Sequence, residues 1–259
     1  MITLGAHADP EPEAWSIWTA SDESANTIID HSAWGEFLGH YVQEHESGIN
    51  FVAYADVDSK DRVSAQAYIQ RLTDQDPKKL RKEEQLAYWI NLYNALTVEV
   101  VLRNPDESSI RKMGDNLFSI GPWDDKLIEI ADESLSLNDI EHRILRPIWR
   151  DHRIHYAVNC ASISCPNLAP VPYTSESVEK MFSAAEKSYI NHSRGVRFND
   201  QGQLNLAKIY SWYSGDFAND EAELLRYLSR HHATAADRLR EYTGRVRYNY
   251  DWSLNSSVN

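Results

Sequence analysis

The sequence predicts an α+β fold: a single domain with a buried central helix packed on a small, mainly antiparallel sheet and several surrounding helices. Apolar residues at helical spacing cover nearly the whole circumference of residues 82–102, which indicates a central, buried helix. Residues 196–206 resemble a β-hairpin around a turn at 199–202, and residues 245–252 alternate like a half-buried strand. No internal repeat, low-complexity tract or linker interrupts the chain, so we expect one domain over residues 30–259.

The other elements are assigned in chain order from apolar spacing and capping residues. Residues 1–29 are polar and acidic and are expected to form an N-terminal arm laid on the domain. Ser32 is expected to cap the first helix, and Pro105 follows the end of the central one. We expect helices at 32–42, 61–72, 82–102, 136–145, 176–189, 220–230 and 234–242, and strands at 49–57, 127–130, 153–159, 196–206 and 245–252.

Two asparagines on the central helix are the first candidate site residues. Asn91 and Asn94 lie one turn apart and can touch each other. Buried amides need hydrogen-bond partners, so these side chains either pin a neighbouring loop or line a site. In the second case they are candidate substrate-binding residues, together with Trp89 on the same helix.

A helix expected after the capping box Ser136-Leu-Asn-Asp139 carries a buried carboxylate. Glu141 falls in an apolar row of this helix, so its carboxyl group must be paired, or neutral with a raised pKa. His142 and Arg146 lie one turn apart on an adjoining face. Because adjacent helix residues diverge by about 100°, Glu141 is expected to contact another element, such as the strand at 153–159, rather than His142.

The most chemically capable segment is His155-Tyr-Ala-Val-Asn-Cys-Ala-Ser-Ile-Ser-Cys165-Pro166, which holds the only two cysteines of the chain. Its pattern predicts a buried strand that runs into a polar loop. His155 and Asn159 share one face of this strand. The loop adds the two thiols and two candidate substrate-binding residues, Ser162 and Ser164. The chemistry of these thiols therefore decides which class of function is open to the protein.

Three long segments together resemble the bacterial domain of unknown function 547 family. They are Leu86-Ala-Tyr-Trp-Ile-Asn-Leu-Tyr-Asn-Ala95, Leu135-Ser-Leu-Asn-Asp-Ile-Glu-His-Arg-Ile-Leu-Arg146 and Arg153-Ile-His-Tyr-Ala-Val-Asn-Cys-Ala-Ser-Ile-Ser-Cys-Pro166. The resemblance extends over residues 30–255 and is firmest over 80–190. It implies no particular reaction and assigns no catalytic role. Bacterial members of this family often carry a secretion signal, so the resemblance implies a periplasmic or secreted location.

Composition argues against several classes of partner. The net charge of −13 repels phosphate backbones and anionic lipid, so we expect no nucleic-acid partner. The longest apolar candidate, residues 86–102, is interrupted by polar side chains, so we expect no transmembrane segment. Residues 1–6 are too short for the apolar region of a signal peptide. No cofactor is indicated, and the expected partner is an unknown small molecule, peptide or protein.

One hypothesis for function is a non-catalytic binding or scaffold domain, with the loop that holds Cys160 and Cys165 as its functional surface. The two thiols would then form a disulfide or pack as small hydrophobic groups. Glu141 would form a buried ion pair with an arginine such as Arg146 or Arg153.

The alternative is a thiol-dependent acyl-transfer enzyme, such as a peptidase, an amidase or a transglutaminase-like protein. This chemistry needs a thiolate, a base and a group that orients the base. Cys165 is the first choice of nucleophile because it ends a polar loop before a proline, and Cys160 is the second. The base would be His155, with Asn159 on the same strand face, or His142, with Glu141 beside it in sequence, and Asn159 and Glu141 are therefore candidate catalytic residues too. Loop amides would stabilise an oxyanion.

A zinc site is the third hypothesis, because His152, His155, Cys160 and Cys165 are side chains that zinc takes as ligands. In a regular strand the two histidines face opposite sides, and the segment has no tight ligand pair such as C-x-x-C. We therefore expect no metal. The state of the two thiols separates the three hypotheses. A nucleophilic thiol is free and accessible, thiols in a structural disulfide are oxidised, and a protein that binds zinc through them releases the metal on denaturation.

Overall fold

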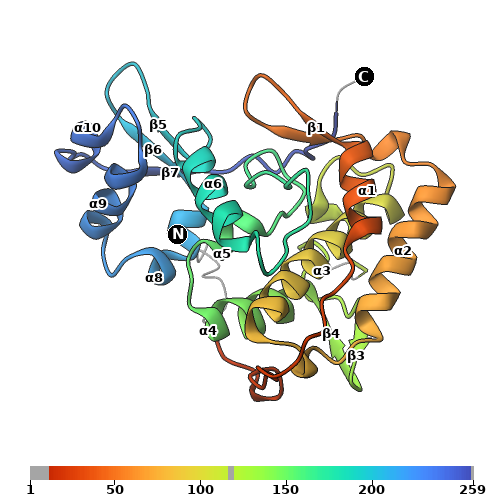
Figure 1. The fold of residues 1–259 in the computed structure, drawn as a ribbon. Coiled ribbons are helices and arrows are strands. Elements are labelled where there is room, and N and C mark those ends of the chain that lie inside the picture. Colours follow the sequence, from red (N-terminus) through yellow and green to blue (C-terminus); the bar gives the residue numbers. More distant parts are fainter. Residues whose placement is uncertain (1–11, 116–119, 258–259) are drawn as a thin grey trace, which may run out of the picture.

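The computed structural model describes residues 12–115 and 120–257 and confirms the α+β class. Helix α3 (Lys82–Arg103) lies near the middle of the molecule (Figure 1). Every residue from Glu84 to Leu102 is buried, as expected for a helix that is apolar nearly all round. The helix ends one residue later than predicted, and it packs mainly against helix α2 and the π-helix η5, whose bounds follow.

The other described helices surround α3 or lie beyond its partners. They are α1 (Ser32–Tyr41), α2 (Ser59–Thr73), the π-helix η5 (Asp139–Leu145), α4 (Arg146–Trp149), α5 (Ile154–Ala157), α6 (Val178–Ile190), α7 (Ile209–Trp212), α8 (Ser214–Phe217), α9 (Glu221–His231) and α10 (Ala236–Arg240). Short 3₁₀ turns are η1 (Ser16–Trp18), η2 (Tyr54–Asp56), η3 (Pro77–Lys79) and η4 (Ile110–Lys112).

The described strands form three small sheets, where the sequence predicted one. The strands are β1 (Val42–Glu44), β2 (Asn50–Val52), β3 (Ile128–Ile130), β4 (Glu133–Leu135), β5 (Val196–Phe198), β6 (Leu204–Ala207) and β7 (Arg247–Asn249). The pairs β1–β2, β3–β4 and β5–β6 are antiparallel hairpins, and β7 lies parallel to β6 with Leu206 opposite Tyr248. The hairpin predicted at 196–206 and the final strand are therefore confirmed.

The elements gather on two sides of the molecule. Figure 1 shows α1, α2 and the β1–β2 hairpin on one side and β5–β7 with α8–α10 on the other. Each side has its own hydrophobic cluster. The larger cluster includes Trp34 and Trp89, and the smaller one includes Leu206 and Leu228. Tyr156 on α5 belongs to the smaller cluster, so α5 lies where the two meet.

The C-terminal segment 250–257 connects the two sides. From β7 it crosses the molecule and ends beside the β1–β2 hairpin (Figure 1). The Ile163 N–H donates to the carbonyl of Ser253 (2.8 Å), and the Val52 N–H donates to the carbonyl of Asn255 (2.8 Å). This segment is thereby attached both to the loop that holds the cysteines and to the far hairpin.

Residues 12–29 lie against the core. The Trp15 N–H donates to the carbonyl of Arg143 (2.9 Å), and the buried ring of Trp18 packs edge-on against Trp89 with ring centroids 5.4 Å apart. Residues 1–11 of the expected arm lie outside the described residues. The division between an arm and a single domain at residue 30 stays a prediction.

The strand predicted at 153–159 is wrong, because the chain forms the helical turn α5 there. Asp151 begins this turn: its Oδ1 accepts the Arg153 N–H (2.9 Å) and its carbonyl accepts the Ile154 N–H (3.1 Å). All residues from 154 to 159 are buried. Alternating apolar residues therefore do not mark two different faces, and their period cannot separate a strand from a helix.

Two smaller expectations also change. The strand expected at 49–57 is restricted to β2, because the chain turns into η2 at Tyr54. Ser32 is the first helical residue rather than the cap, and Asp30 Oδ1 accepts its N–H at 2.9 Å. The capping box is confirmed: the Ser136 N–H donates to Asp139 Oδ2 (2.9 Å) and the Asp139 N–H to Ser136 Oγ (3.2 Å).

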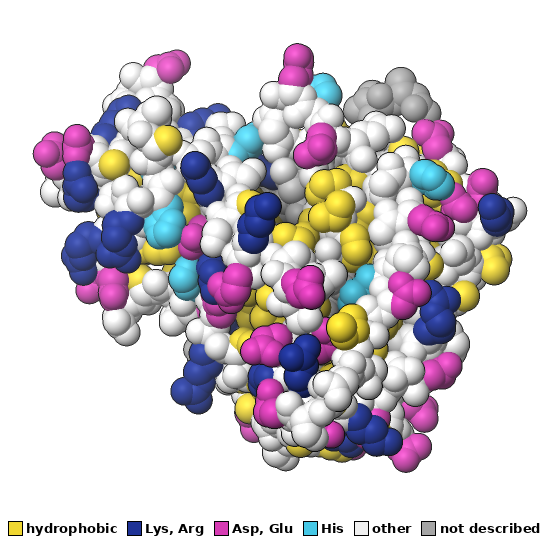
Figure 2. Space-filling view, viewed as in Figure 1, with side chains coloured by type: hydrophobic (Ala, Val, Ile, Leu, Met, Phe, Trp, Pro, Cys, Tyr) yellow, Lys and Arg dark blue, Asp and Glu magenta, His cyan; other side chains and the backbone are white. Residues whose placement is uncertain are grey.

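The surface mixes both signs of charge. Figure 2 shows acidic and basic side chains interspersed over the viewed face, with hydrophobic side chains near its centre. Large hydrophobic side chains exposed in the described ranges are Ile28, Val63, Ile120 and Val171. They come from separate segments, and singly exposed hydrophobic residues are normal for a folded protein.

Candidate functional site

Cys160 and Cys165 meet directly after α5. Both are free thiols, and their Sγ atoms lie 2.8 Å apart in a hydrogen bond. Cys160 is partly exposed, whereas Cys165 is 4% exposed. Cys160 is therefore the less buried residue of the pair.

Local hydrogen bonds fix the backbone of this thiol loop (residues 160–165). Ala161 has a φ of +55°, a left-handed conformation that is uncommon for a residue with a Cβ. Its N–H donates to Asn159 Oδ1 (2.9 Å), and the Asn159 side-chain amide donates to the carbonyl of Pro166 (2.6 Å). Asn94 Oδ1 on α3 accepts the Asn159 N–H (2.8 Å). The loop is thus attached to the central helix.

The three predicted substrate-binding residues of α3 are all buried. Asn94 also donates to the carbonyl of Ala157 (3.0 Å), so the nitrogen and the oxygen of its side-chain amide both bind the backbone just before the thiol loop. Asn91 accepts the N–H of Tyr173 (3.0 Å) and donates to its carbonyl (2.7 Å). Trp89 is fully buried in the hydrophobic core. The structural role weighed for the two asparagines is therefore observed, and a role in substrate binding stays a prediction.

Three polar groups converge on the sulfur of Cys160. Besides Cys165 Sγ, they are Tyr250 Oη at 3.0 Å and Ser162 Oγ at 3.3 Å, and the two hydroxyl groups lie 3.2 Å apart. Tyr250 comes from the C-terminal segment, 90 residues later in the chain. Ser164 faces elsewhere: its Oγ accepts the Asp251 N–H (2.7 Å). Of the two predicted serines, Ser162 contacts the thiol and Ser164 holds the C-terminal segment.

The two thiols differ in acidity. Burial raises the pKa of Cys160, but hydrogen bonds with Cys165, Ser162 and Tyr250 outweigh it and leave that pKa below its ordinary value. Burial and the adjacent Cys160 raise the pKa of Cys165 well above the ordinary value. Cys160 is therefore the sulfur that ionises first, and Cys165 stays a thiol.

A buried charge cluster lies next to the thiol loop. The π-helix η5 directs Glu141 into the interior, and Tyr93 Oη donates to its carboxylate (3.0 Å). His155 on α5 lies between two carboxylates: Nδ1 is 3.7 Å from Glu141 Oε1, and Nε2 is 2.7 Å from Asp216 Oδ2. The ring of Tyr213 stacks on the imidazole, with ring centroids 4.0 Å apart. Glu141 thus contacts another element, as predicted.

Arg146 completes the charge cluster. Its Nε donates to Asp216 Oδ2 (2.6 Å), and its guanidinium lies 3.0 Å from His142 Nδ1. Because arginine only donates, His142 Nδ1 is an acceptor here. Burial, together with Arg146, lowers the pKa of His142 to about 4. Burial raises the pKa of Glu141, but His142, His155 and Arg146 lower it to about 2, so this carboxyl group is paired and ionised.

The charge cluster acts on the thiol loop through Glu141, whose negative charge raises the pKa of Cys160. Within residues 12–115 and 120–257, no hydrogen bond joins His155 or His142 to either sulfur. The loop amides expected to bind an oxyanion are also engaged. The N–H groups of Ile163, Ser164 and Cys165 donate to the carbonyls of Ser253, Asp251 and Ser162, respectively.

The four side chains of the zinc hypothesis do not come together in the structure. His152 Nε2 lies 3.0 Å from Glu186 Oε1, and His155 is bonded to Asp216, so only the two cysteines remain together. The described part of the chain contains no group of three or more histidine, cysteine or acidic side chains that could hold a metal ion.

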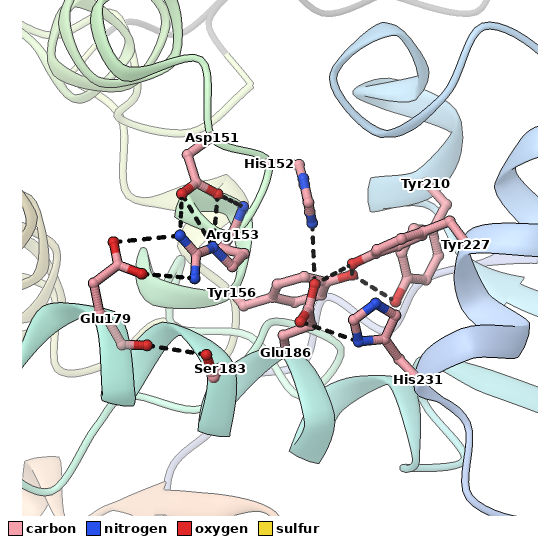
Figure 3. Close-up of polar contacts among 10 residues, drawn as sticks. All are labelled: Asp151, His152, Arg153, Tyr156, Glu179, Ser183, Glu186, Tyr210, Tyr227 and His231. Atoms are coloured by element: carbon pink, nitrogen blue, oxygen red, sulfur yellow. Dashed lines mark hydrogen bonds and ion pairs between the residues drawn. The ribbon is translucent and has the colours of Figure 1, made fainter.

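A second polar cluster joins side chains of α5, α6 and α9 (Figure 3). The buried carboxylate of Glu186 accepts the Tyr227 hydroxyl (2.7 Å) and lies 3.0 Å from His152 Nε2 and 3.2 Å from His231 Nδ1. The Tyr227 hydroxyl is in turn 2.9 Å from that of Tyr156. These contacts join α5, α6 and α9, so the role of the cluster is to hold these helices together.

The segment that carries α3, η5, α5 and the thiol loop can be compared with known families. Residues 77–190 match a family model. That family is DUF547, described as a protein of unknown function. The resemblance found in the sequence is thereby confirmed for this segment. The DUF547 match includes Glu141, His155 and both cysteines, but it ends before Asp216 and Tyr250. No curated protein and no solved structure gives a significant match to the chain.

Sequence reasoning missed the residues that complete the site from outside the DUF547 segment. Tyr250 was assigned only to a half-buried strand, and Asp216 lies in a short aromatic stretch that carried no motif. Their partners are 90 and 61 residues away, respectively. No local pattern reports such pairings. As for membranes, none of the described helices has the length and apolar character to cross one.

Proposed function

We propose that the protein is a thiol-dependent enzyme in which Cys160 is the nucleophile. The observation that supports this most directly is the convergence of Tyr250, Ser162 and Cys165 on the sulfur of Cys160. Donors around a sulfur stabilise its thiolate, which is the reactive form. A cysteine that only fills space needs no such environment.

The proposal assigns attack to Cys160 rather than to Cys165, the first choice from the sequence. Cys160 is partly exposed and its pKa is lowered, whereas Cys165 is buried and its pKa is raised. Cys160 is the less buried of the two residues, and its thiol is also the one that ionises first. Both properties favour the same sulfur.

The reaction class that follows is acyl transfer to Cys160 from an amide or ester of a small molecule or a peptide. The thiolate attacks the carbonyl carbon, and the hydroxyl groups of Tyr250 and Ser162 are the nearest proton donors for the departing group. The buried pair of Glu141 and His155 acts on the loop through the negative charge of Glu141, which raises the pKa of Cys160. A periplasmic or secreted location is part of this proposal, and it is supported only by the resemblance to a family whose bacterial members often carry a secretion signal.

The competing function is a non-catalytic binding or scaffold domain. Two observations favour it. The amides of Ile163, Ser164 and Cys165 are already bonded, which leaves them unable to stabilise an oxyanion without rearrangement. In addition, two cavities of about 350 and 440 Å³ are lined by other elements: one by α2, α3 and β3, the other by the α7–α9 region.

The rate of alkylation by iodoacetamide, measured against pH and mapped by peptide mass, tests the proposal. A free cysteine has a pKa of about 8.5, and we expect native Cys160 to react quickly at pH values well below this. Cys165 should stay unreactive until the protein unfolds. A panel of amides and esters should then be turned over by the native protein and not by Cys160→Ala. If Cys160 is modified only after unfolding, the enzyme proposal is contradicted and the binding-domain function is favoured.

A further inference from the structure

We propose that Cys160 and Cys165 form a dithiol–disulfide exchange site, in which Cys160 attacks a substrate disulfide and Cys165 resolves the mixed disulfide. This adds a second activity at the thiol loop, and it rests on the proposed reactivity of Cys160. The substrate class is a small-molecule or peptide disulfide. It differs from an amide or ester in that the atom attacked is sulfur rather than carbon.

The distance between the two sulfurs is the first support. The Sγ atoms are 2.8 Å apart without a bond between them. A disulfide bond is about 2.05 Å long, so less than 1 Å of approach separates the dithiol from the disulfide. Cysteines that are buried only for packing have no need to lie this close, and a small rotation of either side chain covers the difference.

The unequal exposure of the two thiols is the second support. Cys160 is a partly exposed residue whereas Cys165 is 4% exposed, so we expect an external disulfide to approach the pair from the side of Cys160. Attack by a reachable thiol and resolution by a buried neighbour is the order that dithiol exchange requires. The difference in acidity runs the same way, because the thiolate is the attacking form.

The backbone around the pair is held independently of the sulfurs. The N–H groups of Ile163 and Ser164 donate to the C-terminal segment, and the Asn255 N–H donates to the carbonyl of Ala161 (3.1 Å). The Cys160 N–H itself donates to Cys165 Sγ (2.8 Å), where it stabilises negative charge on the resolving sulfur. Closing and opening the disulfide therefore needs side-chain movement within a fixed loop.

The exchange balances in two steps. In the first, the Cys160 thiolate attacks a disulfide R–S–S–R, forms a Cys160–S–S–R bond and releases one R–S⁻, which takes up a proton from solvent. In the second, the Cys165 thiol loses its proton to solvent or to the departing group and its sulfur attacks Cys160 Sγ. This forms the Cys160–Cys165 disulfide and releases the second R–SH. The protein is oxidised by two electrons, and the substrate disulfide is reduced to two thiols.

Glutathione disulfide is the probe for the test. The full-length native protein is incubated with it, quenched with acid and analysed by intact and peptide mass. We expect the wild-type protein to lose two hydrogens, with Cys160 linked to Cys165 and little adduct present. Cys165→Ser should accumulate one glutathione on Cys160, and Cys160→Ser should remain unmodified. Wild-type protein that accumulates the adduct and never closes the internal disulfide overturns the inference.

A parallel alkylation separates this inference from the proposed function. If Cys160 alkylates quickly but the wild-type protein stops at the glutathione adduct, the exchange site fails and the nucleophile stands. If Cys160 reacts with neither iodoacetamide nor glutathione disulfide in the native protein, both fail. The wild-type masses decide between these results even where a serine variant does not fold. Ser256→Cys, which adds a thiol elsewhere in the C-terminal segment, controls for unspecific glutathionylation.

Discussion

The phenolic oxygen of Tyr250 lies 3.0 Å from the sulfur of Cys160, a contact between residues 90 positions apart. The contact exists because the C-terminal segment leaves β7 and crosses beside the thiol loop, where backbone hydrogen bonds hold it. A hydroxyl group from the segment after β7 thereby reaches a thiol in the loop that follows α5. The acidity of Cys160 consequently depends on the tertiary structure around it.

Removal of this donor is the first prediction. Tyr250→Phe should raise the pKa of Cys160, because one of the hydrogen bonds that stabilise the thiolate is lost. We expect alkylation at pH 7 to slow by about tenfold, since a hydrogen bond to a charged group contributes about 1.5 kcal/mol. The measurement is the pH profile of alkylation. Tyr248→Phe, which affects a hydroxyl bonded to Glu221, is the matched control and should leave the profile unchanged.

The charge of Glu141 should act in the opposite direction. Glu141→Gln removes a negative charge that raises the pKa of Cys160, so that pKa should fall and alkylation near neutral pH should accelerate about twofold to threefold. Folding is verified by circular dichroism before the rates are compared. An unchanged rate in a folded variant would show that the charge cluster and the thiol are not coupled.

Asp216 should contribute strongly to stability. It pairs with Arg146 at 2.6 Å and with His155 at 2.7 Å, and both partner side chains are at most 5% exposed. Asp216→Asn removes the negative charge that Arg146 and His155 share, so the free energy of unfolding should fall by about 2–3 kcal/mol in urea denaturation. The control is Asp237→Asn, which breaks an exposed pair with Arg240 and should change stability by less than about 0.5 kcal/mol. Equal effects of the two substitutions would contradict the prediction.

Asn94 should hold the thiol segment in place. Asn94→Ala leaves the Asn159 N–H and the Ala157 carbonyl without their partners in the interior. We expect a loss of about 2–4 kcal/mol in the free energy of unfolding, because each buried polar group left unpaired costs about 1–3 kcal/mol. Asn249→Ala, on an exposed strand position, removes one asparagine–asparagine bond and should be nearly neutral. Both are compared by urea denaturation.

Acid should weaken the fold through His142 and then Glu141. The pKa of His142 falls from 6.5 in the unfolded chain to about 4 in the folded protein, so its contribution is fully present above pH 6.5 and is lost as pH falls towards 4. Glu141, with a pKa lowered from 4.5 to about 2, contributes above pH 4.5 and loses that contribution below it.

The unfolding free energy measured between pH 2 and 7 checks this order. His142→Gln keeps an acceptor for Arg146 but cannot be protonated, so its stability should be flatter than that of the wild type between pH 6.5 and 4. Below pH 4 the two proteins should decline in parallel. Parallel curves from pH 7 to 4 would mean that His142 is not held neutral by burial.

Much of the framework follows from local sequence. The helix predicted at 82–102 appears as α3 because its apolar residues cover all sides, and burial on all sides leaves only a central position. The capping box at Ser136 and Asp139 and the burial of Glu141 are also local consequences of spacing. The thiol loop was recognised from composition alone, since both cysteines of the chain lie in it.

By itself the sequence determined the central helix, the hairpin at 196–206 and which segment holds the reactive side chains, because each depends on residues within a few turns of one another. Tertiary structure alone decided that 154–157 is a helical turn rather than part of a strand, since burial on every side removes the periodic signal. It also decided that Asp216 holds His155 and that Tyr250 reaches Cys160. Those contacts depend on how distant elements pack, and no local spacing encodes them.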